Sequence, residues 1–325
     1  MDYDIFNGDA DGICALHQLR LAEPRPDAEL VTGVKRDIKL LSRLEGVSSS
    51  RLTVFDISMQ SNLPHLENLL AADNSITYID HHFSGDIPEN DNLTSHIDPN
   101  PAVCTSLIVS KLLEHRYGLW AVAGAYGDNL HDSASQLGHQ LELDNEQLDQ
   151  LRRLGELLNY NGYGADLDDL HFHPADLYRS VHSFTSPFDF IDTSQDLAKL
   201  SRGYDNDMER AMAVTSLDTQ GPHRVYRFPN ESWARRVAGV YSNLRAREKQ
   251  SLAHALIGEN SDGSLRISVR APLNDRKNAD TLCLEFPSGG GRAAAAGINN
   301  LPLEMEGQFI NRFQESFPNP TDIEP

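Results

Sequence analysis

Cysteine is scarce in this chain, which has three cysteines in 325 residues. Cys14, Cys104 and Cys283 are far apart in the sequence, and no C-x-x-C pair occurs. Disulfide-stabilised domains and cysteine zinc sites both need several closely spaced cysteines. The sequence therefore indicates neither kind of site, and it fits a reducing compartment.

The sequence also lacks long apolar runs. No stretch approaches the roughly 18 apolar residues that a membrane span needs. The first residues, MDYDIF, have neither the basic segment nor the apolar segment of a secretory leader. We therefore expect a cytoplasmic protein with no membrane partner.

Basic residues are few in relation to acidic ones. The chain has 28 lysines and arginines against 48 aspartates and glutamates, a formal net charge of −20. Such a charge repels a long polyanion unless a local basic patch or bound cations reverse the field. Long nucleic acid is therefore a poor candidate for a partner.

The order of the expected elements predicts an α/β fold. Strand-like apolar runs alternate with segments of helical spacing, beginning with 2–7 and 10–23 and continuing to about residue 118. Strands that alternate with helices form a parallel sheet covered by helices on both faces. From about residue 231, one helix and two strand candidates around a polar turn indicate a second, smaller α/β domain.

The length of the chain agrees with two domains, because a single domain usually contains roughly 100 to 200 residues. We assign residues 1–185 to a catalytic domain, 186–225 to a connecting region, and 226–325 to a domain that recognises substrate.

Four aspartates each follow a short apolar run: Asp9 after YDIFNG, Asp56 after LTVF, Asp80 after ITYI and Asp128 after AVAGAYG. A single aspartate after a strand is more often a turn or helix-cap residue. In a parallel sheet, however, the carboxyl ends of the strands share one edge, and ligands bind there. We therefore expect the four carboxylates to converge at this edge.

Asp11 and His81 can point into the same space. Crowded carboxylates repel one another and take up protons unless cations neutralise them. Oxygen ligands with one or two imidazoles suit Mn²⁺ or Mg²⁺ better than a thiolate-rich zinc site does. We predict two divalent cations, with Mn²⁺ preferred over Mg²⁺. Two such ions about 3.5 to 4 Å apart can activate water and bind both oxygens of a displacement at phosphorus.

At these residues the sequence resembles the DHH phosphoesterase superfamily, nearly end to end. The D-x-D-G motif of the family matches residues 9–12, its isolated aspartate matches Asp56, its DHH motif matches residues 80–82, and a fourth motif matches Asp128 in GDN. The C-terminal family motif, glycines followed by His or Arg and then A-A-G, matches GGGRAAAAG at 289–297. The resemblance implies an N-terminal DHH domain and a C-terminal DHHA1 domain.

The resemblance also implies a role for each matched residue. The residues that would bind the two cations are Asp9, Asp11, Asp56, His81 and Asp128, with Asp56 as the bridge. Asp80 would support His81 or touch a cation. His82 would contact the scissile phosphate or help to protonate the leaving oxygen, since an imidazolium lowers the cost of developing charge.

The chain departs from the family pattern at two positions. Many relatives have a histidine where Ile5 stands, and exonucleases of the RecJ type have an aspartate where Asn7 stands. One ligand of those relatives is therefore missing. Asn7 would either bind a cation weakly through its amide oxygen or shape the turn.

The predicted substrate-binding residues lie in the second domain. Gly289, Gly290 and Gly291 would let backbone amides approach an anion, because glycine permits positive φ and has no Cβ. Arg292 would bind a phosphate or a base of the substrate, and the alanines after it suggest the start of a helix. The resemblance suggests that Arg270, at the end of a strand, also reaches the substrate.

Lys35 and Arg36 follow the second expected strand, at the same edge as the carboxylates. For these two residues we favour a solvated position at the start of a helix.

We therefore expect a cation-dependent phosphodiesterase that hydrolyses very short oligoribonucleotides, such as the dinucleotide pGpG, to 5′-mononucleotides. Three alternatives stay open: hydrolysis of a phosphoanhydride such as pyrophosphate, an exonuclease acting on longer strands, and a nucleotide-binding regulator without catalysis. The sequence also leaves open whether the chain forms a homodimer.

Overall fold

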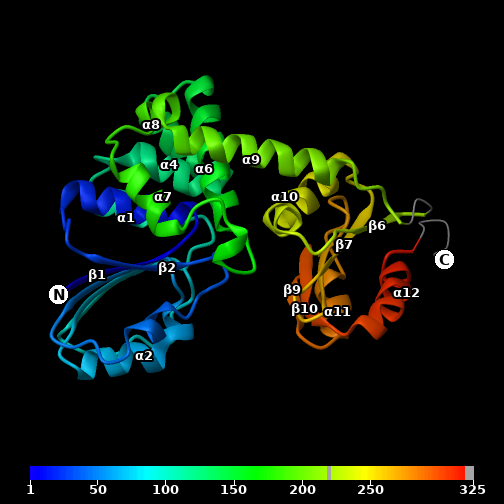
Figure 1. The fold of residues 1–325 in the computed structure, drawn as a ribbon, viewed down its shortest axis with the longest axis horizontal. Helices are drawn as coiled ribbons and strands as arrows, with labels where there is room; N and C mark the ends of the chain where they lie inside the picture. The colour runs from blue at the N-terminus through cyan, green and yellow to red at the C-terminus, as the bar shows by residue number, and fades with distance from the viewer. Residues whose placement is uncertain (218–220, 319–325) are drawn as a thin grey trace. The chain divides into compact units, whose positions relative to one another are not determined.

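The computed structural model describes residues 1–217 and 221–318. The chain divides into two compact units, Met1–Gly203 and Tyr204–Pro325, and each contains a five-stranded sheet (Figure 1). The division falls within α9 (Gln195–Met212), inside the span expected to connect the domains. The predicted α/β fold with a second, smaller domain is confirmed.

The first sheet is parallel throughout, with the strand order β2-β1-β3-β4-β5. Its strands are β1 (Asp2–Asn7), β2 (Glu29–Gly33), β3 (Arg51–Phe55), β4 (Ser75–Asp80) and β5 (Leu93–Ile97). The central strands are buried on both faces because helices cover both sides, with α1 on one face and α2 on the other (Figure 1).

Ten helical segments of the first unit connect and cover these strands. They are α1 (Ala10–Ala22), η1 (Leu40–Leu44), α2 (Met59–Ala71), α3 (Thr105–Leu112), α4 (Gly118–Gly127), α5 (His131–Gln140), α6 (Asn145–Gly162), η2 (Leu167–Asp169), α7 (Pro174–His182) and α8 (Pro187–Thr193). Of the helices within the described ranges, none is long and apolar enough to cross a membrane.

The apolar run before Asp128 is helix α4, so its interpretation as a strand was wrong. The helix is buried nearly all round, and such a helix has no polar face to reveal its period. Its small residues allow close packing: a Cβ on Gly124 would lie 2.3 Å from Ser106 Oγ, and a Cβ on Gly127 would lie 2.3 Å from Ala10 Cβ.

The second unit is a mixed sheet with the strand order β6-β7-β8-β10-β9. Its elements are β6 (His223–Arg227), α10 (Ser232–Glu248), β7 (Ala253–Glu259), β8 (Leu265–Arg270), α11 (Ala279–Leu284), β9 (Gly289–Arg292), β10 (Ala295–Leu301), η3 (Leu303–Met305) and α12 (Glu306–Ser316). Alternate residues of β8 are buried, and they pack with Phe309 and Phe313 of α12 in one apolar core. The sequence after this helix, ending FPNPTDIEP, is typical of a loose tail, and from position 319 onward it lies outside the described residues.

The segment GGGRAAAAG forms the hairpin of β9 and β10, so the helix expected at its alanines is wrong. Alanine favours helices locally, but tertiary pairing overrides a weak propensity. Here Ala295 and Ala296 pair with Arg270 and Val269 of β8. A Cβ on the next residue, Gly297, would lie 2.7 Å from the Ile267 carbonyl oxygen, so the neighbouring strand requires a small residue there.

Candidate metal centre

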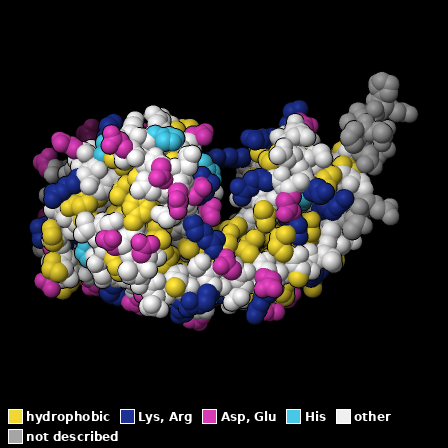
Figure 2. All heavy atoms as spheres, turned by 90° about the horizontal axis from the view of Figure 1, so that it is seen from above, with side chains coloured by type: hydrophobic (Ala, Val, Ile, Leu, Met, Phe, Trp, Pro, Cys, Tyr) yellow, Lys and Arg dark blue, Asp and Glu magenta, His cyan; other side chains and the backbone are white. Residues whose placement is uncertain are grey.

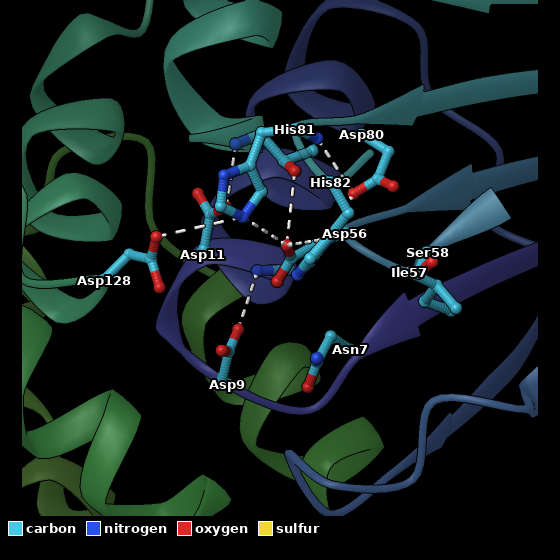
Figure 3. Close-up of polar contacts among 12 residues, drawn as sticks. Asn7, Asp9, Asp11, Asp56, Ile57, Ser58, Asp80, His81, His82 and Asp128 are labelled. Atoms are coloured by element: carbon cyan, nitrogen blue, oxygen red, sulfur yellow. Dashed lines mark hydrogen bonds and ion pairs between the residues drawn. The ribbon is translucent and has the colours of Figure 1, made fainter. Parts of the chain in front are cut away.

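The carboxyl edge of the first sheet gathers the predicted acidic side chains (Figure 3). Asp9 follows β1, Asp56 follows β3, and Asp80 is the last residue of β4; each is at most 2% exposed. Asp128 reaches the same space from the end of helix α4. Three of the four carboxylates therefore come from strand ends, as expected, and the fourth comes from a helix.

Asp9 and Asp11 are fixed by backbone amides at two helix starts. Asp9 is the N-cap of α1, and its Oδ1 accepts a hydrogen bond from the Gly12 amide at 3.1 Å. The Asp11 oxygens accept from the amides of Thr105 at 2.8 Å and Ser106 at 2.7 Å. The carboxylate of Asp11 thus caps the start of α3, where no side chain of the helix's own N-cap residue does so.

Asp56 lies at a turn that few side chains adopt. Its φ is +57°, in the left-handed region that costs a non-glycine residue energy. Its backbone amide donates to the Ile79 carbonyl oxygen at 3.1 Å, and its Oδ1 accepts from Thr105 Oγ1 at 3.3 Å. Neighbouring elements on both sides thus hold the carboxylate in place.

The ring of His81 presents a lone pair to the carboxylates. Its Nδ1 lies 3.0 Å from the Val103 carbonyl oxygen, and a carbonyl only accepts, so Nδ1 carries the proton. In the neutral ring Nε2 is then unprotonated. It lies 3.4 Å from Asp56 Oδ1 and 3.8 Å from Asp128 Oδ2. This arrangement, with a carbonyl behind the ring, is typical of metal-binding histidines.

His82 is oriented by Asp80. Asp80 Oδ1 accepts from His82 Nδ1 at 2.7 Å and from the His81 backbone amide at 2.8 Å. Asp80 thus holds the ring of the second histidine, whereas it contacts the first only through its backbone. Burial lowers the pKa of His82, but the hydrogen bond and charge of Asp80 outweigh it and raise the pKa above its usual value. The ring is 44% exposed and its Nε2 is left for a ligand.

Asp56 lies among the other carboxylates of this edge. Burial, together with the charges of Asp9, Asp11 and Asp128, raises the pKa of Asp56 well above its usual value. Burial and the charge of Asp11 likewise raise the pKa of Asp128 to about 6. A carboxylate cluster of this kind is stabilised by a bound cation.

The residues fit a divalent cation. One ligand atom from each of Asp56, His81 and His82 lies within 4.8 Å of the other two. The oxygens Asn7 Oδ1 and Asp80 Oδ2 are buried and have no hydrogen-bond partner among the described residues. Carboxylate and amide oxygens with imidazole nitrogens suit Mn²⁺ or Mg²⁺.

Solved structures share this fold over nearly the whole chain. An exonuclease RecJ bound to manganese superposes with a TM-score of 0.59 at 16% identity, covering 99% of this chain and 92% of its own. A pGpG-specific phosphodiesterase, PggH from Vibrio cholerae, gives 0.56 at 13% identity, covering 96% and 97%. At these identities the likeness shows a shared fold, that of RecJ and PggH.

A third structure, RecJ from Thermus thermophilus in complex with Mn²⁺, gives a TM-score of 0.59 at 16% identity. It covers 98% of this chain but 52% of the longer RecJ chain. No protein-family model matches the chain, and no curated protein matches it. The two-domain α/β fold that the resemblance implied is therefore confirmed, because these structures share it over nearly the whole chain.

Lys35 lies among the carboxylates at the edge of the first sheet, so the solvated position favoured for it is wrong. Its Nζ donates to Asp9 Oδ2 at 2.6 Å and to Asn159 Oδ1 at 3.2 Å, and lies 3.6 Å from Asp128 Oδ1. The helix expected after it is only the short η1, which begins at Leu40. The available signal was the place of Lys35 after β2, at the same edge as the carboxylates.

The predicted substrate-binding residues belong to the second, DHHA1-like unit. Arg270 Nε donates to Asn243 Oδ1 at 2.8 Å. Strand β9 is the outermost strand of its sheet, so one row of its backbone amides faces away from β10. A Cβ on Gly291, whose φ is +141°, would lie 2.4 Å from Ala296 Cα, whereas a Cβ on Gly290 would meet nothing within 4 Å.

Proposed function

We propose that this chain is a divalent-cation-dependent phosphodiesterase that hydrolyses very short oligoribonucleotides, with dinucleotides such as pGpG as the preferred length, to 5′-mononucleotides. The observation that carries the proposal is the placement of His81 Nε2, 3.4 Å from Asp56 Oδ1, beside a second histidine held by Asp80. Structures with the same fold include a protein named as a pGpG-specific phosphodiesterase.

The first unit supplies the groups that hold the cation. Asp56, His81, Asp11 and Asp128 would bind it, and Asp9 would complete the acidic edge. A divalent cation bound there supplies Lewis-acid chemistry, since it makes water easier to deprotonate and offsets charge on a phosphoryl oxygen.

His82 supplies the proton for the leaving group. In hydrolysis, the oxygen of water forms a new bond to phosphorus and releases one proton to solvent, and the bond from phosphorus to the 3′ oxygen breaks. With Nδ1–H held by Asp80, the imidazolium gives its Nε2 proton to the 3′ oxygen. The raised pKa of His82, which the hydrogen bond to Asp80 sustains against burial, favours this protonated form. The exposed ring then takes a new proton from water.

The second unit supplies recognition of the substrate. Arg292 is exposed, and within the described part of the chain its side chain makes no hydrogen bond or ion pair. Together with Arg270, it can bind a terminal phosphate or a base edge. Recognition of the end group favours short substrates.

A substrate series graded by length tests the proposal. With Mn²⁺, we expect mononucleotide release from a diribonucleotide to exceed release from a five- or ten-residue strand at least tenfold. Pyrophosphate and an inactive His81→Ala variant serve as controls. Equal rates at all lengths would favour an exonuclease, phosphate release from pyrophosphate alone would favour a phosphoanhydride hydrolase, and binding without turnover would favour a regulator.

A further inference from the structure

Lys35 places a fixed positive charge inside the acidic edge. The three oxygens around its Nζ belong to Asp9 at 2.6 Å, Asn159 at 3.2 Å and Asp128 at 3.6 Å. Two of these residues, Asp9 and Asp128, were predicted to bind divalent cations. The ammonium group is therefore bound by oxygens that a second divalent cation would need.

The structure around Lys35 holds the side chain in this position. The Lys35 amide donates to the Gly162 carbonyl oxygen at 2.9 Å, and the Lys35 carbonyl accepts from Asn7 Nδ2 at 3.3 Å. Asn159 and Gly162 belong to the last turn of α6, where the helix dipole favours a cation. The ring of Tyr163 lies 5.8 Å from Nζ and adds a cation–π contact.

Lys35 distinguishes Asp9 from Asp56, although the two carboxylates are equally buried. Asp9 Oδ2 forms an ion pair with Lys35 Nζ at 2.6 Å, and Asp9 Oδ1 accepts from the Gly12 amide at 3.1 Å. Within the described residues, Asp56 forms no ion pair with a lysine or arginine, and the imidazoles of His81 and His82 are the only basic groups within 4.0 Å of its carboxylate. A charged group of the protein therefore already balances Asp9, whereas Asp56 is left for a cation.

We propose that the Lys35 ammonium stands in for one of the two divalent cations expected from the sequence, so that each chain binds a single divalent cation on the Asp56–His81 side of the edge. This inference rests on the proposed function only in taking the edge to bind divalent cations.

Counting bound Mn²⁺ tests the inference without a measurement of activity. Metal-free protein is titrated with Mn²⁺ by calorimetry, and its metal content is measured after gel filtration at saturation. We expect one Mn²⁺ per chain for the wild type, and the isolated-ion spectrum in electron paramagnetic resonance. Two Mn²⁺ per chain, or the spectrum of an exchange-coupled pair, would overturn the inference.

The Lys35→Met variant sharpens the count, because methionine has a similar length and no charge. Without the Lys35 ammonium, the oxygens of Asp9 and Asp128 and the unpartnered Asn7 Oδ1 can bind a second ion. We therefore expect this variant to bind two Mn²⁺ per chain. Lys35→Arg should retain one, as should the matched control Lys39→Met at an exposed lysine. A Lys35→Met variant that folds, as judged by circular dichroism, and still binds one Mn²⁺ would also overturn the inference.

The results separate this inference from the proposed function. One Mn²⁺ per chain without hydrolysis of any dinucleotide supports the inference and contradicts the function. Two Mn²⁺ per chain together with dinucleotide hydrolysis contradicts the inference and supports the function. A wild type that binds no Mn²⁺ contradicts both.

Discussion

The two units of this chain differ in net charge far more than their difference in size would explain. Residues 1–203 contain 14 lysines and arginines against 32 aspartates and glutamates, whereas residues 204–325 contain 14 against 16. The net charge of −20 thus belongs almost entirely to the first unit. In the view of Figure 2, both units show acidic and basic side chains, with many acidic ones on the first unit and many Lys and Arg side chains on the second.

This difference refines the argument from total charge. The field of the first unit repels a polyanion and attracts divalent cations, whereas the second unit is close to neutral and offers arginines to a short anionic ligand. Several of these arginines already have partners, such as Arg236 with Asp207 at 2.8 Å and Arg312 with Glu285 at 2.7 Å. We therefore predict that substitutions in the first unit change turnover, whereas substitutions in the second unit change substrate binding.

The largest effect is expected from Asp56→Asn. Asparagine tolerates the left-handed backbone of this position, so folding is kept while the central negative charge is lost. We expect kcat to fall by about 10³-fold or more, since one electrostatic group at a reaction centre is worth about that much. Mn²⁺ affinity should fall as well.

The control is Asp91→Asn, at an exposed aspartate of the same unit. It should leave both quantities unchanged. In metal-free protein the Asp56→Asn variant should unfold at the same or a higher temperature than the wild type, because it relieves the repulsion that raises the pKa of Asp56 together with burial. Full activity of the variant would contradict the site.

A second effect separates the role of His82 from that of the cation ligands. We expect His82→Ala to lower kcat on a dinucleotide by about 10²-fold, the usual size of a general-acid contribution. With the 4-nitrophenyl ester of thymidine 5′-phosphate the loss should be under about threefold, because this leaving group needs no proton. Equal losses on both substrates would exclude the role of proton donor.

A third effect compares the two cores through their buried histidines. Burial lowers the pKa of His17 to about 3 and that of His254 to about 4. Both values lie below the unfolded value near 6.5, so below pH 6.5 the unfolded state binds protons that the folded state does not. Stability is therefore complete above pH 6.5 and falls as the pH is lowered, by about 2 kcal/mol per histidine at pH 5.

Each unit carries one tryptophan that reports its own unfolding, Trp120 in the first and Trp233 in the second. Urea unfolding at pH 7 and pH 5 can be followed in variants that keep one of the two. His17→Phe should flatten the pH dependence for Trp120 alone, and His254→Phe for Trp233 alone. A pH dependence that both variants leave intact would contradict the assignment.

The smallest effect is expected in the second unit. Arg292→Ala should raise KM for a dinucleotide about tenfold, which corresponds to the loss of about 1.4 kcal/mol from one charge-assisted contact. Turnover at saturation should change little. Arg276→Ala, at an exposed arginine of the same unit, is the control. A fall in kcat without a change in KM would contradict the division of roles between the units.

The sequence by itself determined most of the first sheet and the positions of three aspartates at its carboxyl edge. Asp9, Asp56 and Asp80 each lie at or just after the end of a strand with a clear apolar pattern, and parallel strands that run in one direction end at one edge. Local order along the chain was therefore enough to place these carboxylates together and to place His81 and His82 beside them.

Only the tertiary structure decided the contacts between segments far apart in the chain. The amides that bind Asp11 are 94 and 95 residues away, and the oxygen of Asn159 that binds Lys35 is 124 residues away. No local pattern encodes such pairs, because they depend on which helix end packs at which strand end. For the same reason, Asp128 lies at the end of a buried helix, and the alanines of GGGRAAAAG form part of a strand. In both segments, close packing or strand pairing outweighs the local preference of the sequence.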